Sequence, residues 1–139
     1  MVTVIDARDH VLGRLSSNVA ERILDGETIV VVNAQDILVT GNRSFTFSDY
    51  KTRTDRGKIR KGPYHPRRAD MLFKWTVRGM VPFKKTSGRE ALRRVRAYVG
   101  VPREFEDLEM ERIENAMRVN TGKYTTLGAV AGYLGSNIR

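Results

Sequence analysis

The sequence predicts an α/β fold built on a parallel sheet. Two β-branched runs, residues 2–5 and 28–32, flank a segment in which apolar residues recur at helical spacing from Leu12 to Leu24. The second run is apolar over four consecutive residues, the pattern of a strand covered on both faces, which favours parallel over half-exposed antiparallel pairing. Gly26 stands where a C′ residue would end the helix. These segments together make one β-α-β unit.

The following segments are shorter and their patterns weaker. Residues 37–39 are predicted to form a third short strand, and Gly41 and Asn42 supply turn chemistry before a weakly patterned, aromatic-containing segment at 44–52. An amphipathic pattern resumes over 70–80, with Met71, Leu72 and Trp75 on its apolar side.

A second helix is predicted over residues 87–100. Ser87 and Glu90 fit a capping box at its start, and Gly100 ends it. On a helical wheel one side is apolar, formed by Ala91, Leu92, Val95, Tyr98 and Val99. A separate stripe is cationic, formed by Arg89, Arg93 and Arg96. Such a helix would bury one face and present three guanidinium groups on another.

The last third of the chain contains an acidic segment and a final helix. Residues 104–114 carry six acids and are expected to be solvated, in helical or other form, facing away from any phosphate backbone. Thr125 or Thr126 is predicted to cap a helix that buries Leu127, Val130, Ala131 and Leu134, with Gly128 and Gly132 allowing close packing. A chain of 139 residues fits one domain, residues 1–139.

Charge is distributed unevenly along the chain. The total is +9, but residues 1–50 hold 4 basic and 7 acidic side chains, residues 51–103 hold 17 and 3, and residues 104–139 hold 4 and 6. The middle segment, at +14, carries more than the whole excess. Selection for solubility alone would spread both signs over the surface, so a localised basic face for a polyanion is the better interpretation.

The loop at 56–68 is the most basic part of that segment. It has six Lys and Arg residues, two glycines and two prolines without periodicity, which predicts an extended loop that is poorly ordered without a partner. Tyr64, His65, Phe73, Trp75 and Phe83 are interleaved as possible stacking surfaces for RNA. Phe73 and Trp75 stand at helical spacing, however, and are assigned to the core.

The sequence lacks the motifs that mark several other classes of protein. There is no cysteine, and His10 and His65 are too far apart in sequence to form a local ligand pair, so no metal is expected. The 6–13 loop has one glycine, Gly13, and no dinucleotide or P-loop motif, so Gly13 is expected to allow tight helix-to-strand packing and no cofactor is predicted. Asp9 and His10 lack a nucleophile and an orienting partner, so no catalytic residues are assigned. With no secretory signal or membrane span, a cytoplasmic location is expected.

Four stretches carry a family resemblance, in this order and spacing: DARDHVLGRLSSNVAERILDG, VVVNAQDILVTGN, GPYHPRR and TVRGMVPFKKTSGREALRRVRAYVGVP. The chain closely resembles the L-thirteen family of large-subunit ribosomal proteins from about residue 2 to residue 103. The form GPYHPRR resembles the archaeal branch. The resemblance implies a three-layer α/β/α fold with a four-stranded parallel sheet, without catalytic residues, bound to large-subunit ribosomal RNA as an assembly scaffold.

Carried over by position, the RNA-facing surface lies within residues 51–103. Its predicted loop residues are Lys58, Arg60, Lys61, Tyr64, His65, Arg67 and Arg68. Its predicted continuation is Arg78, Lys84, Lys85, Arg89, Arg93 and Arg96. The expected partners are large-subunit ribosomal RNA and neighbouring ribosomal proteins, with no membrane and no small-molecule substrate. Two alternatives stay open, a regulatory RNA-binding protein acting off the ribosome and a nucleotide-dependent RNA-modifying enzyme.

Overall fold

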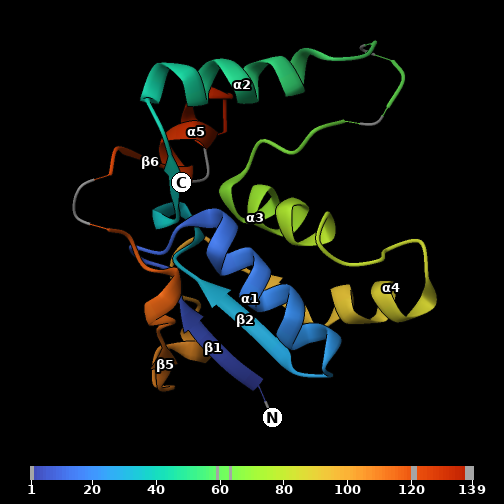
Figure 1. The fold of residues 1–139 in the computed structure, drawn as a ribbon, viewed down its shortest axis with the longest axis vertical. Helices are drawn as coiled ribbons and strands as arrows, with labels where there is room; N and C mark the ends of the chain where they lie inside the picture. The colour runs from blue at the N-terminus through green and yellow to red at the C-terminus, as the bar shows by residue number, and fades with distance from the viewer. Residues whose placement is uncertain (1, 59, 63, 120–121, 137–139) are drawn as a thin grey trace.

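A computed structural model describes residues 2–58, 60–62, 64–119 and 122–136 (Figure 1). The strands are β1 (Val2–Asp6), β2 (Thr28–Val32), β3 (Leu38–Thr40), β4 (Val95–Ala97), β5 (Met110–Glu111) and β6 (Tyr124–Thr126). The α-helices are α1 (Leu12–Leu24), α2 (Arg43–Asp55), α3 (Ala69–Arg78), α4 (Thr86–Arg93) and α5 (Leu127–Tyr133). Three short 3-10 turns, η1 (Ala34–Asp36), η2 (Arg103–Phe105) and η3 (Glu114–Ala116), lie between them.

The main sheet has four strands in the order β4-β2-β1-β5, and every pairing is parallel. β1 and β2 run side by side from Val2 opposite Thr28 to Asp6 opposite Val32, with α1 as the crossover between them. The predicted β-α-β unit and the predicted α/β class are therefore confirmed. Gly26 has φ +100°, a conformation that glycine adopts without strain, and it follows α1 as expected.

The sheet is buried on both faces. Ile5, Ile29 and Val31 belong to the larger core beneath α1, α3 and α4, whereas Val4, Val30 and Val32 pack against the segment that contains η2. That second layer consists of Tyr98, Val101, Phe105 and Met110. Helices on one face and the η2 segment on the other give an arrangement consistent with the predicted three-layer fold.

The third strand forms a separate small sheet. β3 begins one residue later than predicted and pairs antiparallel with β6, from Leu38 opposite Thr126 to Thr40 opposite Tyr124. α5 follows β6 directly, and the Thr126 hydroxyl accepts a hydrogen bond from the Ala129 N–H at 3.2 Å. Leu127, Val130, Ala131 and Leu134 are buried, so the predicted final helix is confirmed. A Cβ on Gly128 would approach the Gln35 carbonyl oxygen to 3.0 Å, which confirms close packing there.

The predicted helix over 87–100 is wrong in its second half. α4 ends at Arg93, and Val95–Ala97 form β4 beside β2 instead. The capping box is also wrong, because α4 begins at Thr86 after Lys85 without a side-chain cap. Its start is fixed by close packing, since a Cβ on Gly88 would lie 2.0 Å from the Pro82 carbonyl oxygen. Arg96 therefore projects from a strand, apart from Arg89 and Arg93 on α4.

Two segments whose secondary structure the sequence left open are now defined, and one expectation, about Gly13, is wrong. The weakly patterned segment at 44–52 lies in a full helix, α2, of which only Thr46 and Tyr50 are buried. The acidic segment contains η2, β5 and the start of η3, and it lies at the lower left of Figure 1, away from α4. Gly13 faces open space, so the expectation that it allows tight packing is wrong.

Candidate nucleic-acid interface

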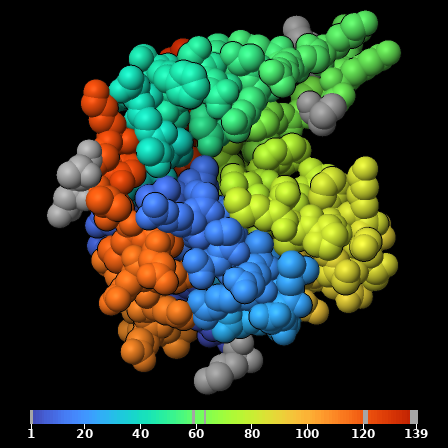
Figure 2. All heavy atoms as spheres, viewed as in Figure 1, coloured from blue at the N-terminus to red at the C-terminus, as the bar shows by residue number. Residues whose placement is uncertain are grey.

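The basic loop (residues 56–68), the end of α3, and α4 carry most of the predicted surface residues and lie toward the right of Figure 1. Arg96 is on β4, opposite Val30. Eleven of the predicted residues are exposed: Lys58, Arg60, Lys61, Tyr64, Arg67, Arg68, Lys84, Lys85, Arg89, Arg93 and Arg96. His65 and Arg78 are half-buried. These thirteen residues are called the basic surface below. In Figure 2 the green arm formed by the end of α2 and the basic loop projects beyond the body, above a recess over α3 and α4.

Most cations of the basic surface have no acidic partner. Within the described part of the chain, no carboxylate lies within 4.0 Å of the side-chain nitrogens of Lys58, Arg60, Lys61, Lys84, Lys85, Arg89, Arg93 or Arg96. Like charges held together without counter-charge repel one another and attract a polyanion. Acids that would neutralise the surface are instead gathered in the 104–114 segment.

The end of the basic loop is attached to the body of the protein. The Arg67 Nη1 donates a hydrogen bond to the Leu134 carbonyl oxygen at 3.1 Å, just beyond α5. Arg68 forms an ion pair with Asp70 at 3.2 Å, in the first turn of α3. These two residues therefore position the loop as well as adding charge.

The aromatic residues of the basic segment divide into buried and exposed groups. Phe73 is fully buried, as predicted, whereas Trp75 is 39% exposed and its assignment to the core is wrong. The reason is that the buried face of α3 is centred on Leu72, Phe73 and Val77, which leaves Trp75 at its edge. Tyr64, on the loop, is 67% exposed.

His65 and Arg78 both contact Trp75. The His65 ring meets Trp75 edge-on with centroids 5.7 Å apart, and the Arg78 guanidinium lies 4.9 Å from the Trp75 centroid and 4.4 Å from that of Phe83. Burial lowers the pKa of His65 and the charge of Arg53 adds to this, although the hydrogen bond with Pro66 opposes it. The neutral ring is thus favoured near pH 7, with Nδ1–H donating to the Pro66 carbonyl oxygen at 3.0 Å.

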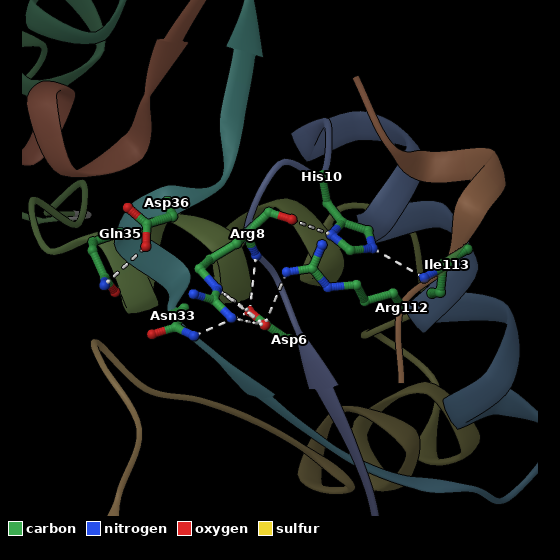
Figure 3. A network of polar contacts seen from close by, with 8 residues as sticks. All are labelled: Asp6, Arg8, His10, Asn33, Gln35, Asp36, Arg112 and Ile113. Carbon is green, nitrogen blue, oxygen red and sulfur yellow. Dashed lines mark hydrogen bonds and ion pairs between the residues drawn. The ribbon is translucent and has the colours of Figure 1, made fainter. Parts of the chain in front are cut away.

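A second polar cluster, the Asp6 network, consists of Asp6, Arg8, Asn33 and Arg112, whose side chains converge on the Asp6 carboxylate in Figure 3. Arg8 forms an ion pair with Asp6 at 2.8 Å, Arg112 reaches it at 3.4 Å, and Asn33 donates a hydrogen bond at 3.0 Å. Burial alone would raise the pKa of Asp6, but the hydrogen bonds from Arg8 and Asn33 outweigh it and hold that pKa well below its usual range.

The Asp6 network fills the place where a doubly wound fold would bind a nucleotide. The chain adds strands in one direction from β1 to β2 and β4, and then adds β5 on the other side of β1. Ligands of such sheets bind at the carboxyl ends of the strands where this direction changes. Here Asp6 ends β1, Arg112 follows β5, and their ion pair spans that position.

His10, beside the network, is committed to structural hydrogen bonds. It is fully buried, its Nε2 accepts a hydrogen bond from the Ile113 N–H at 3.0 Å, and its Nδ1 donates to the Arg8 carbonyl oxygen at 3.0 Å (Figure 3). With both ring nitrogens engaged, His10 has no lone pair left for general-base chemistry. Its role is to hold the 110–116 segment against the loop after β1.

The described residues show neither a metal-binding cluster nor a membrane-spanning helix. Among the described residues, no cluster of three or more His, Asp or Glu side chains is placed to hold a metal ion. Across the same residues, no helix has the length and apolar character that crossing a bilayer requires.

Sequence reasoning missed part of this surface. Arg53 and Arg56, at the end of α2, and the exposed ring of Trp75 all adjoin a hollow beneath the loop, together with Gly57 and His65. The helix that carries Arg53 was not predicted, because its apolar periodicity is weak. Charge density alone was a signal for Arg56, which opens the run of cations in the basic loop.

The fold and the surface together define a class, that of small α/β proteins with an exposed cationic face and with polar side chains filling the usual ligand crevice of the sheet. The family model for Ribosomal protein L13 matches residues 1–104, and the chain belongs to that family. Its members are structural constituents of the large ribosomal subunit rather than enzymes.

Curated relatives match over nearly the whole chain. Large ribosomal subunit protein uL13 of Archaeoglobus fulgidus is 52% identical over 136 residues, covering 96% of this chain and 87% of the relative. The protein of the same name from Halobacterium salinarum is 46% identical over 135 residues, covering 97% and 92%, and that from Methanosphaera stadtmanae is 44% identical over 140 residues, covering 98% and 99%. The predicted archaeal type is thereby confirmed.

Proposed function

We propose that this chain binds large-subunit ribosomal RNA through the basic surface and scaffolds assembly of the subunit, in contact with neighbouring ribosomal proteins. The observation that carries the proposal is the set of exposed cations along the basic loop, α4 with the residues before it, and β4. Eight of them have no carboxylate within 4.0 Å among the described residues. Such side chains neutralise phosphates and release condensed counterions from the RNA.

The two halves of the fold have different tasks in this proposal. The α/β core is close to neutral or slightly acidic and supplies a rigid support. The basic loop and α4 extend from that support on the same side, separated by the recess seen in Figure 2, so they are placed to contact two neighbouring RNA segments. Contacts to phosphate and to the shape of the RNA dominate, because double-stranded RNA offers side chains little base information.

The location follows from the partner. A protein that functions in the large subunit resides on the ribosome in the cytoplasm, and the family membership supports this placement. Fractionation of a native lysate on a sucrose gradient tests it. We expect cosedimentation with the large subunit that persists at moderate salt and is weakened at high salt. Sedimentation as a small free species would favour the regulatory alternative instead.

A pair of charge variants tests the surface itself. Replacing Arg89 and Arg93 with Ala removes two cations from α4, whereas replacing Arg14 and Lys123 removes two exposed cations from outside the basic surface. Only the first variant should make the plot of log affinity against log salt shallower, by about 1.5, because two phosphate contacts are lost. Equal effects of the two variants would mean that net charge matters and the basic surface does not.

A further inference from the structure

The most distinctive feature of the basic surface is a hollow of about 250 Å³ under the loop, lined by Arg53, Arg56, Gly57, His65 and Trp75. It adjoins a second hollow of about 300 Å³ that shares Arg56, Gly57 and His65 and continues to Asp55 and Lys58. Both lie at the root of the arm that projects in Figure 2. Their size is at or below the lower end of small-molecule sites, which suits a single base.

Aromatic and cationic side chains line this hollow together. Trp75 is 39% exposed, with the Arg78 guanidinium over its ring at 4.9 Å and the His65 ring against it at 5.7 Å. These contacts fix the indole in one orientation while leaving part of it accessible. A large exposed aromatic surface amid positive charge is what proteins use to stack unpaired bases of single-stranded RNA.

Arg53 and Arg56 are the charged residues that line the hollow, and the carboxylates near them are paired. Arg53 is ion-paired with Asp49 at 2.8 Å. Asp55 lines the adjoining hollow and is ion-paired with Lys51 at 3.5 Å. Neither carboxylate lines the hollow beside Trp75, so a base that enters it meets aromatic rings and cations. Gly57, with φ +88°, has no side chain to block the entrance.

From this arrangement we propose that the hollow receives one unstacked base of the bound RNA, which stacks on Trp75 while Arg53 and Arg56 contact the phosphates on either side of it. The inference rests on the proposed function and adds to it a single-stranded element of the RNA. Base stacking then supplements the phosphate contacts at one point of an otherwise shape-directed surface.

The test uses the fact that Trp75 is the only tryptophan of the chain, so its fluorescence reports on this hollow. The full-length protein is titrated with a fluorescently labelled oligouridylate and, separately, with an RNA duplex of equal length. Anisotropy of the label measures binding and tryptophan emission measures stacking. We expect both RNAs to bind, but only the single strand to quench Trp75 strongly. Equal quenching by the duplex, or binding of the single strand without quenching, would overturn the proposal.

Variants separate stacking from general affinity. Trp75→Leu should weaken binding of the single strand by roughly fivefold or more, while Trp75→Phe retains most of the affinity and duplex binding changes by less than about twofold in both. Phe45→Leu, at a 69% exposed aromatic on α2, is the matched control and should change neither. If neither RNA bound the unaltered protein, the proposed function would fail as well. If both bound and Trp75→Leu were neutral, only the base site would fail.

Discussion

The Asp6 network and the basic surface both depend on arginine, and they use it in opposite ways. In the network, Arg8 and Arg112 surround a buried carboxylate and their charges are compensated within the fold. On the basic surface, Arg89, Arg93 and Arg96 have no such partner among the described residues. The comparison shows that the number of arginines says little about function until each is assigned a counter-charge. In this chain, uncompensated charge is what distinguishes the proposed binding side from the Asp6 network.

The largest effect is expected from breaking the network. Asp6→Ala leaves Arg8 and Arg112 without their carboxylate and should lower the free energy of unfolding by about 3 kcal/mol, at the low end for a buried ion pair because both arginines are half exposed. Chemical denaturation measures this, with Asp107→Ala as an exposed acidic control that changes little. RNA affinity of the folded variant should stay unchanged, and a large loss of affinity would show that the two regions are not independent.

Acid should remove the same contribution in the unaltered protein. The pKa of Asp6 is lowered in the folded state, so the unfolded chain takes up a proton first as the pH falls. The contribution is therefore complete above the ordinary value of about 3.8 and is lost as the pH drops below it toward the lowered folded pKa. Unfolding followed between pH 6 and pH 2 should be less steeply pH-dependent for Asp6→Asn. A parallel dependence in both proteins would contradict this reasoning.

Within the basic loop, free and attached cations should behave differently. Replacing Arg60 and Lys61 together with Ala should weaken RNA binding by roughly tenfold at low salt and leave thermal stability nearly unchanged, because exposed charges contribute little to folding. Arg67→Ala should also lower the free energy of unfolding, by about 1 kcal/mol, because it removes the hydrogen bond to the Leu134 carbonyl oxygen. A marked loss of stability in the first variant would mean that the middle of the loop packs on the core.

The smallest effect is expected from an exposed ion pair whose members belong to neither the Asp6 network nor the basic surface. Lys51 and Asp55 stand four residues apart on α2 at 3.5 Å, and both are more than half exposed. Lys51→Ala should change the free energy of unfolding by only about 0.3–0.5 kcal/mol. A much larger value from denaturant titration would show that α2 depends on surface charge for its stability.

Patterns that are strong over short distances predicted the centre of the fold. The β-branched runs and the helical spacing from Leu12 to Leu24 identify β1, α1 and β2, since each pattern is internally consistent. β4 was mistaken for the end of a helix because Val95 and Val99 also fit helical spacing, and only pairing with β2, more than sixty residues earlier, decides between the two. α2 was missed because it buries only Thr46 and Tyr50.

The exposure of the cationic side chains could be predicted from their charge alone. Loop and helix cations such as Arg60 and Arg89 are exposed as expected. The exposure of Trp75 was not predictable, because its spacing on α3 matches that of core residues and only the direction in which α3 packs leaves it at the edge. The Asp6 network was equally hidden, since Arg112 joins it from a position 106 residues away.

The hydrogen bond between Arg67 and the Leu134 carbonyl oxygen has a consequence for the order of events during synthesis. The two residues of this hydrogen bond are 67 positions apart. Likewise, β3 cannot form its sheet until β6 has been synthesised. While the chain is emerging, the loop is complete long before its anchor exists. The basic loop therefore gains its anchor only after residue 134 has been translated. A nascent chain that stops short of it would carry the charges of the loop without this attachment.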